Sequence, residues 1–266
     1  MKKIFMNLVF VMMVTNVFAL TFNVDGITYS SKSGSTVEVT SQEGYYKGIV
    51  VIPSTVLNAG ISYTVTTIGE DAFDNCEDLT SVTIPSSVTT IKMGAFSGCS
   101  SLKSMTIPST VSTIENSVFA NCERLLTINV DPDNANYCSQ NGILFDKNKK
   151  TLMCFPMSNA AETYSLPNTV LEISDFAFAG VFTLTSVTLP STLKSIGKFA
   201  FGSSNLKIIT ILANTPPTLE DDSFEGTLKG ISIYVLNSSL DAYKNASDWK
   251  VFPNIKGISA DLPTLK

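Results

Sequence analysis

Five cysteines are the residues of this chain whose chemistry and spacing attract attention first. Cys76, Cys99 and Cys122 lie 23 residues apart, and Cys138 and Cys154 follow at other intervals. Thiols can serve as nucleophiles, disulfide partners or metal ligands. The chain has no histidine, which excludes Ser–His–Asp and Cys–His catalysis and imidazole metal sites. It also lacks the Cys-x-x-Cys spacing that is typical of a zinc site.

The even spacing of the first three cysteines favours packing over redox chemistry. Residues at one position in successive turns of a repeat lie about 4.8 Å apart, as neighbouring parallel strands do. Two such thiols would form a disulfide only in strained geometry. The equivalent residues in later turns are Val181 and Ser204, which cannot form a disulfide. We therefore expect the three periodic thiols to be reduced and buried as small apolar groups.

Cys138 and Cys154 flank a predicted hairpin. The apolar segments 142–145 and 151–154 are separated by the charged segment 146–150, a pattern that indicates two antiparallel strands. If Phe145 pairs near Leu152, Cys154 lies opposite Ile143 rather than opposite Cys138. A disulfide between the two cysteines is therefore disfavoured, and their oxidation state stays open at this point.

Acidic residues form the second group with chemical potential, clustered at 70–78 and 220–222. A glycosidase needs two carboxylates about 5–10 Å apart across a cleft, whereas these acids recur at the start of a short turn, where they favour the local dipole and solubility. Residues 131–134 (Asp-Pro-Asp-Asn) carry the oxygen ligands that calcium prefers, but a tight turn is the interpretation we favour. We predict no catalytic residue, metal ligand or cofactor, and no enzyme activity.

The period of 23 residues also fixes phenylalanine, at Phe73, Phe96 and Phe119 and, in the same phase, at Phe178, Phe201 and Phe224. A repeat this short cannot bury its own apolar face, so neighbouring units must stack and share one core. Within a unit, the alternation Val82-Thr83-Ile84 indicates a strand with one buried face, which Pro85 ends. The Ala-Phe step that follows predicts a tight turn that places the ring in the core.

The segment Thr-Ile-Pro-Ser-Ser-Val-Thr-Thr-Ile at 83–91, followed by Gly-Ala-Phe-Ser-Gly-Cys-Ser-Ser-Leu at 94–102, resembles the BspA-type leucine-rich repeat of bacterial surface proteins. The resemblance covers roughly residues 49–236, with three units before an interruption and two or three less complete ones after it. The asparagine usual after the strand is absent, which is normal for the BspA type. The resemblance implies a β-rich, right-handed solenoid of about six coils, with parallel strands on one face.

The chain divides into four predicted segments, the third of which contains an insert. Residues 1–19 indicate a secretory signal peptide, with Lys2 and Lys3 before an apolar run and a cleavage site near Ala19. A membrane anchor is the alternative, but the run is shorter than the ~20 residues a span needs. Residues 20–51 are predicted as an N-terminal cap with a hairpin at Asp25-Gly26. The solenoid follows at 52–236, with a hairpin tip at 58–60 and a β-hairpin insert at 131–164. Residues 237–266 form a C-terminal cap with a short amphipathic helix.

The surface chemistry predicts a weak, repeated binding face. Without residues 1–19 the chain has 16 basic and 23 acidic residues, a net charge of −7, which disfavours nucleic acid and anionic membranes. The outward strand positions form a polar ladder without the Trp, Tyr or Arg of binding hot spots, although Ile208 also points outward. The polar ladder consists of Ser81, Thr83, Ser104, Thr106, Thr127, Asn129, Ser186, Thr188 and Thr210.

The resemblance implies a secreted or cell-surface bacterial protein that mediates adhesion. Its expected partner is a host extracellular matrix or cell-surface protein, or a glycan, bound along the polar ladder with avidity from successive coils. The rival interpretation is a non-binding structural spacer of the cell envelope, since threonine also suits an exposed strand for its own sake. No membrane span is expected, and the chain is expected to be a monomer.

Overall fold

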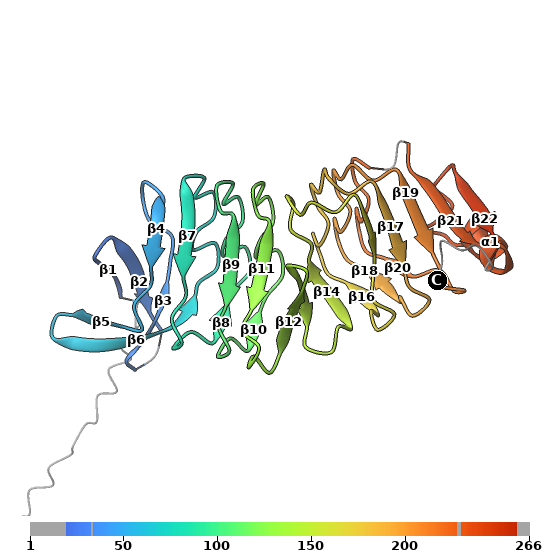
Figure 1. The fold of residues 1–266 in the computed structure, drawn as a ribbon. Coiled ribbons are helices and arrows are strands. Elements are labelled where there is room, and N and C mark those ends of the chain that lie inside the picture. The colour runs from blue at the N-terminus through green and yellow to red at the C-terminus, as the bar shows by residue number, and fades with distance from the viewer. Residues whose placement is uncertain (1–19, 33, 228–229, 260–266) are drawn as a thin grey trace, which may run out of the picture.

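The computed structural model describes residues 20–32, 34–227 and 230–259. The chain winds into a β-solenoid of about eight turns (Figure 1), which confirms the predicted solenoid architecture. The predicted number of about six was too low, because strands at both ends join the stack without carrying the Ala-Phe motif. The predicted signal peptide lies outside the described residues.

Each turn contributes one short strand to a row along the front of the molecule in Figure 1, called the strand row below. Paired neighbours in the strand row are parallel. Hydrogen bonds join β4 to β7 and β9 to β11, and they join β15, β17, β19, β21 and β22 in that order. The strand row consists of β4 (Gly48–Val51), β7 (Leu79–Thr83), β9 (Ser104–Ile107), β11 (Thr127–Val130), β15 (Thr163–Ser165), β17 (Ser186–Leu189), β19 (Ile208–Ile211), β21 (Ser232–Leu236) and β22 (Ile255–Ile258).

A second row of mostly two-residue strands closes the other side of each turn. Its first half consists of β6 (Ile61–Ile68), β8 (Thr90–Ile91) and β10 (Thr113–Ile114). Its second half consists of β14 (Thr151–Cys154), β16 (Glu172–Ile173), β18 (Ser195–Ile196) and β20 (Thr218–Leu219). One Ile or Leu of each strand points into the core, for example Ile91 beside Ile114, and it is buried in every strand except β20, where Leu219 is partly buried.

The N-terminal cap begins with the predicted hairpin. β1 (Thr21–Val24) and β2 (Ile27–Ser31) pair around Asp25 and Gly26, whose φ angles of 51° and 81° suit the tight turn. β3 (Thr36–Val39) pairs with β2 and, in parallel, with β6, so the cap continues the second row. β5 (Thr55–Asn58) pairs with β6 around Ala59 and Gly60, which confirms the second predicted hairpin tip.

The insert forms β12 (Tyr137–Gln140), β13 (Ile143–Asp146) and β14. Phe145 pairs with Leu152 as predicted, but Cys154 lies opposite Leu144 and not Ile143. The prediction was wrong by one residue because the register shifts between Leu144 and Phe145, where a bulge adds a residue to one strand. Cys138 pairs with Phe145 on the other side of β13, and both thiols are free.

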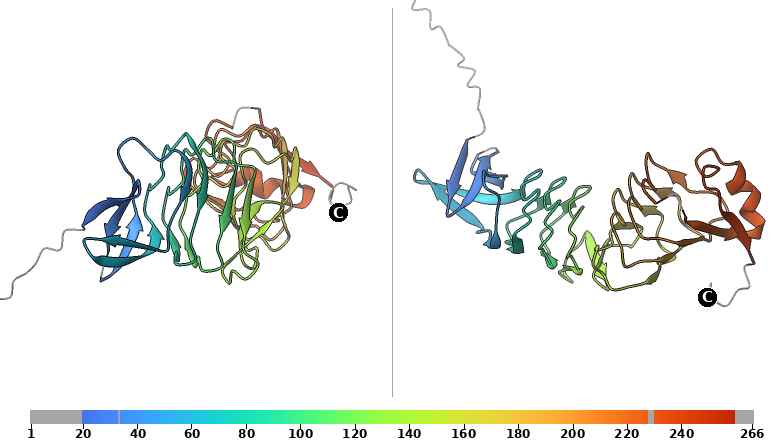
Figure 2. Two further views of the ribbon diagram at one scale, coloured as in Figure 1. Left: turned by 60° about the vertical axis from the view of Figure 1, so that its left-hand side comes forward. Right: turned by 90° about the horizontal axis from the view of Figure 1, so that it is seen from above.

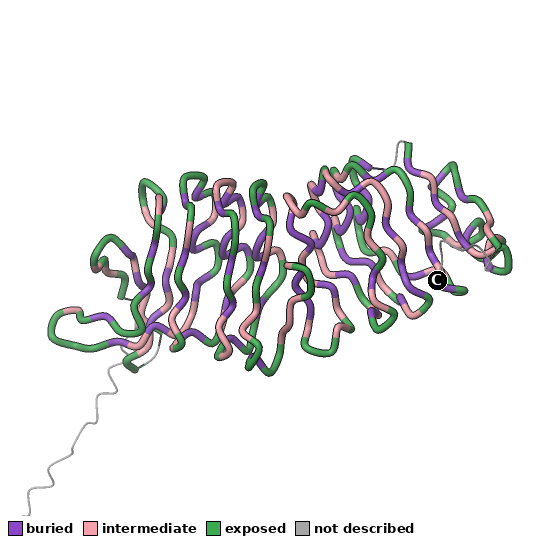
Figure 3. The backbone as a smooth tube through the Cα atoms, in the orientation of Figure 1, coloured by how far each residue is buried: buried purple, intermediate pink, exposed green. Residues whose placement is uncertain are grey.

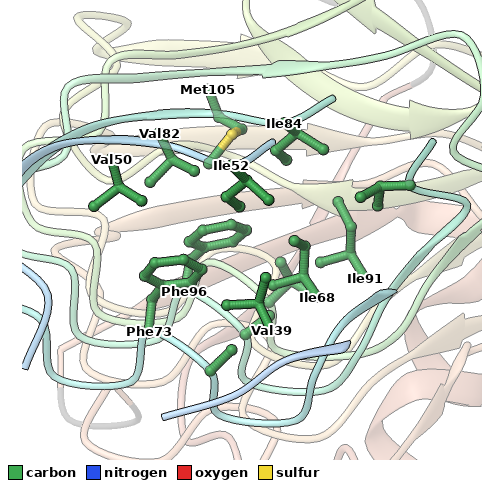
Figure 4. Packing of buried hydrophobic residues seen from close by; sticks show 14 of the residues in the cluster. Val39, Val50, Ile52, Ile68, Phe73, Val82, Ile84, Ile91, Phe96 and Met105 are labelled. Atoms are coloured by element: carbon green, nitrogen blue, oxygen red, sulfur yellow. The ribbon is translucent and has the colours of Figure 1, made fainter. Parts of the chain in front are cut away.

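Buried side chains from both rows fill the interior of the solenoid. Along the backbone, buried positions alternate with exposed ones in every turn (Figure 3). The periodic phenylalanines stack between turns: the Phe73 and Phe96 ring centroids are 5.1 Å apart and those of Phe96 and Phe119 are 5.8 Å apart. Figure 4 shows the first two rings parallel below Val82 and Ile52. Stacking of this kind lets each turn bury its apolar face on the next, as the repeat requires.

The core consists of two clusters that meet at the insert, with Leu144 in the first and Ile143 and Phe145 in the second. Seen from above, the solenoid bends at the same place (Figure 2). At the far end, a 3₁₀ helix (Asn237–Ser239) leads into α1 (Leu240–Asn245), the short helix that was predicted. Tyr243 and Trp249 are buried there, and the Trp249 ring covers Phe224, which closes the C-terminal end of the core.

Candidate functional site on the strand row

The polar ladder lies on the outward side of the strand row. Along β9, Ser104 and Thr106 are exposed while Met105 and Ile107 are buried, and the other strands alternate in the same way. This follows from the two-residue period of a strand, whose apolar set is held by the core. Every residue of the polar ladder is at least partly exposed.

Strand pairing brings the ladder residues into register. Ser104 lies beside Thr127, and Thr106 beside Asn129. In the second half, Ser186 lies beside Ile208, and Thr188 beside Thr210. The outward groups of paired strands therefore form two lines that cross the strands. Along each line, residues on neighbouring strands are about 4.8 Å apart.

The ladder is not continuous. β11 packs on β12 and β13 of the insert, and in the described part of the chain no strand pairing joins β11 to β15. In the described part of the chain β7 and β9 are not joined by strand pairing either, although they pack side by side. By position, Ser81 to Asn129 lie on the half before the insert and Ser186 to Thr210 on the half after it. β15 extends the second group with Thr163 and Ser165, which pair with Ser186 and Thr188.

Apolar and aromatic residues at both ends of the strand row were missed by the sequence reasoning. Ile49 lies beside Ser81 and Val51 beside Thr83, on β4, and they were assigned to the cap. Tyr234 lies beside Thr210, and the Lys256 ammonium stands 5.9 Å from its ring centroid. The signal for β21 was available, since Ser232 to Val235 alternates polar and apolar residues as the repeat strands do.

The periodic thiols lie in the core. Cys99 Sγ donates to the Phe73 carbonyl oxygen at 3.2 Å, and Cys122 Sγ donates to that of Phe96 at 3.1 Å. Burial raises the pKa of both thiols well above the ordinary value, and it raises the pKa of Cys154 to about 12. Such thiols are protonated and poorly nucleophilic at neutral pH. Thr227 donates the same hydrogen bond to the Phe201 carbonyl oxygen, so the position serves packing and backbone satisfaction.

The acidic clusters occupy turns. Asp131 accepts the Asn134 N–H at its carbonyl oxygen and the Asp133 N–H at Oδ1, both at 2.9 Å, as the predicted turn requires. Asn134 itself is buried: it donates to the carbonyl oxygens of Pro108 and Val111 and accepts N–H bonds from Asn136 and Tyr137. Glu220, Asp221 and Asp222 line an open cavity of about 350 Å³. Within the described ranges, no three Cys, Asp or Glu side chains are grouped as a metal site requires.

Comparison with known proteins bears on the repeat. The sequence profile of the BspA type leucine rich repeat region matches residues 54–149 and 151–247 with six copies, and so confirms the resemblance. A search of curated protein sequences gives no match. The fold is similar to a leucine rich cell surface protein from Faecalibacterium prausnitzii, with 19% identity, a TM-score of 0.52, and coverage of 91% of this chain and 96% of that one. The pneumococcal vaccine antigen PcpA matches at 16% identity with a TM-score of 0.48, over 91% of this chain and 99% of that chain.

Proposed function

Because the chain belongs to the BspA-type leucine-rich repeat family, we propose that it is a secreted or cell-surface bacterial protein that binds an extracellular protein along the strand row. One observation carries the proposal: polar side chains from successive turns stand in register on the outward side, as in Ser104 beside Thr127. A surface that repeats the same chemistry from turn to turn suits an extended partner.

The residues at the C-terminal end of the strand row favour a protein partner over a glycan. Ile208 is 40% exposed and stands in line with Ser186, and Tyr234 with Lys256 follows on the next strands. Aromatic anchors such as tyrosine dominate protein-binding energies, while the surrounding contacts exclude water and add complementarity. The second half of the strand row therefore supplies the anchor, and the polar ladder supplies hydrogen bonds.

The site needs no membrane span, and in the part of the chain that the structure describes no helix has the length and apolar composition to cross a bilayer. The partner class we propose is a host extracellular matrix or cell-surface protein, with a glycan as the second class to screen. The alternative role is an inert spacer, because threonine is favoured on exposed strands without any ligand.

The test is a pair of charges in the middle of the polar ladder. Thr106→Glu with Thr127→Lys changes two outward side chains on adjacent strands, and should shift the free energy of unfolding by about 0.5 kcal/mol or less per site. A screen of immobilised matrix proteins and a glycan array with the parent chain identifies the partner. The affinity for that partner should fall about tenfold for each ~1.4 kcal/mol by which the charges weaken the binding free energy.

The matched control places the same charges on the second row, at Thr113→Glu with Thr90→Lys, which are neighbours on β10 and β8. This variant should bind as the parent does. A partner that binds both variants equally well would place the site away from the strand row. If the screen finds no partner, the spacer role is the better description.

A further inference from the structure

β4 ends the strand row at the N-terminal side (Figure 1) and has an open edge. It pairs with β7 and with no other strand among the described residues. The Gly48 N–H donates to the Asp78 carbonyl oxygen at 2.8 Å, and the Ile52 N–H donates to that of Thr83 at 3.1 Å. Alternate residues of a strand turn their backbone groups to the same side, so the N–H and C=O of Ile49 and Val51 face the open edge.

The side chains at this edge are apolar and exposed. Ile49 is 73% exposed and Val51 is 63% exposed, whereas the residues beside them on β7 are Ser81 and Thr83. Natural proteins protect edge strands with charges, prolines, bulges or a covering element, because a bare edge pairs with other chains. β4 has a register shift between Gly48 and Ile49, but neither charge nor proline within the strand.

A cavity of about 430 Å³ lies at the start of the same strand. It is lined by Tyr45, Tyr46, Lys47, Asn75, Glu77 and Asp78. Lys47 pairs with Asp78 at 3.1 Å, which leaves the Glu77 carboxylate without an ion pair in the described part of the chain. The Tyr45 side chain is 58% exposed. An aromatic ring and an unpaired carboxylate around one cavity favour a cationic side chain.

We propose that the β4 edge and this cavity bind an extended segment of a partner protein, which adds to the sheet as a further strand. The segment places alternate apolar residues against Ile49 and Val51, and an arginine or lysine in the cavity beside Glu77. Main-chain hydrogen bonds give affinity in this mode, and the alternate side chains give specificity. The site is separate from the centre of the polar ladder, and it stands whether or not the ladder binds.

A flexible segment fits the edge better than a second folded copy of this chain. β4 has four residues, about 13 Å of strand, and two folded domains joined along so short an edge would bury far less than the roughly 1,000 Å² that a specific interface needs. The chain also carries a net charge of −5, which repels a second copy and attracts a basic segment.

The test uses fluorescence anisotropy with the full chain and a labelled octapeptide, in which arginine is followed by valines at alternate positions separated by threonines. A second peptide has the reverse order, because the incoming strand can run in either direction. We expect saturable binding of one of them. Val51→Pro removes an outward N–H while Val50 and Ile52 keep their pairing with β7, and should weaken binding by about tenfold or more. The control Thr113→Lys, at an exposed position of the second row, should change it by less than about twofold.

The Glu77→Gln variant tests the contribution of the cavity to binding independently of the β4 edge. It should weaken binding of the arginine peptide severalfold but leave unchanged the binding of a peptide with norleucine in place of arginine. The proposal is overturned if neither peptide saturates at millimolar concentration, if Val51→Pro binds as tightly as the parent, or if sedimentation shows a dimer that Val51→Pro abolishes. Thermal unfolding verifies each variant, and Val51→Lys replaces Val51→Pro if the proline variant does not fold.

Discussion

Replacing Phe96 with alanine tests whether stacked rings hold the turns of the solenoid together. The Phe96 side chain is fully buried between two near-parallel rings, with interplanar angles of 11° to Phe73 and 5° to Phe119. Truncation of a buried phenylalanine costs about 3–5 kcal/mol, of which each aromatic pair that is removed supplies about 0.5–1.5 kcal/mol. Because the variant lacks a stacking partner for the rings on both sides, we expect about 4–5 kcal/mol.

The assay is thermal and urea unfolding followed by circular dichroism. For a chain of this size, 1 kcal/mol corresponds to about 2–4 °C, so the melting temperature should fall by about 8–20 °C. Phe119→Ala should cost a comparable amount. The matched control is Phe182→Ala, because Phe182 is 64% exposed and its loss should change stability by about 0.5 kcal/mol or less. A Phe96→Ala protein that melts within one or two degrees of the parent would refute the shared core.

Three further predictions concern buried polar chemistry. Thiol titration should find Cys76, Cys99 and Cys122 unreactive until the chain unfolds, since burial raises the pKa of each; mass spectrometry that finds any of them in a native disulfide would contradict this. Burial raises the pKa of Cys154 to about 12, so the native chain keeps protons that the unfolded chain releases from about pH 9 upward. Urea unfolding should therefore show a free energy of unfolding that is constant between about pH 7 and pH 9 and falls from pH 9 towards pH 12, and a rise over that range would contradict the argument. Asn134→Ala should cost about 2–4 kcal/mol, because two of its four hydrogen bonds tie the turn to the preceding coil and the other two hold the turn itself, whereas the exposed Asn136→Ala should be near neutral.

The sequence predicted most where neighbouring turns share a pattern. The period of Phe96 and Cys99 indicated the core, and Asp25-Gly26 indicated the first hairpin, because both signals are local or repeated. β4 was missed because its membership in the strand row depends on pairing with β7, some 30 residues further on, and no local pattern reports that pairing. The buried role of Asn134 was missed for the same reason, since the carbonyl groups that it satisfies belong to the preceding turn.

The insert explains why the candidate site has two parts. β14 takes the place of a repeat strand in the second row, with Leu152 beside Ile173, and Phe155 takes the place of a repeat phenylalanine, 5.1 Å from the Phe178 ring centroid. Strand pairing nevertheless stops at the insert in the second row, because β10 and β14 are not paired among the described strands, and a side-chain hydrogen bond crosses the junction from Asn116 Nδ2 to Asp175 Oδ2 at 2.9 Å. On the strand row the described strands β11 and β15 are likewise not paired. A partner therefore either binds one half or spans the bend. Charges placed at Thr188 and Thr210 distinguish these two cases by their effect on affinity. If the partner spans the bend, they should weaken binding as much as charges at Thr106 and Thr127 do. If the partner binds one half, only one of the two pairs of charges should weaken binding.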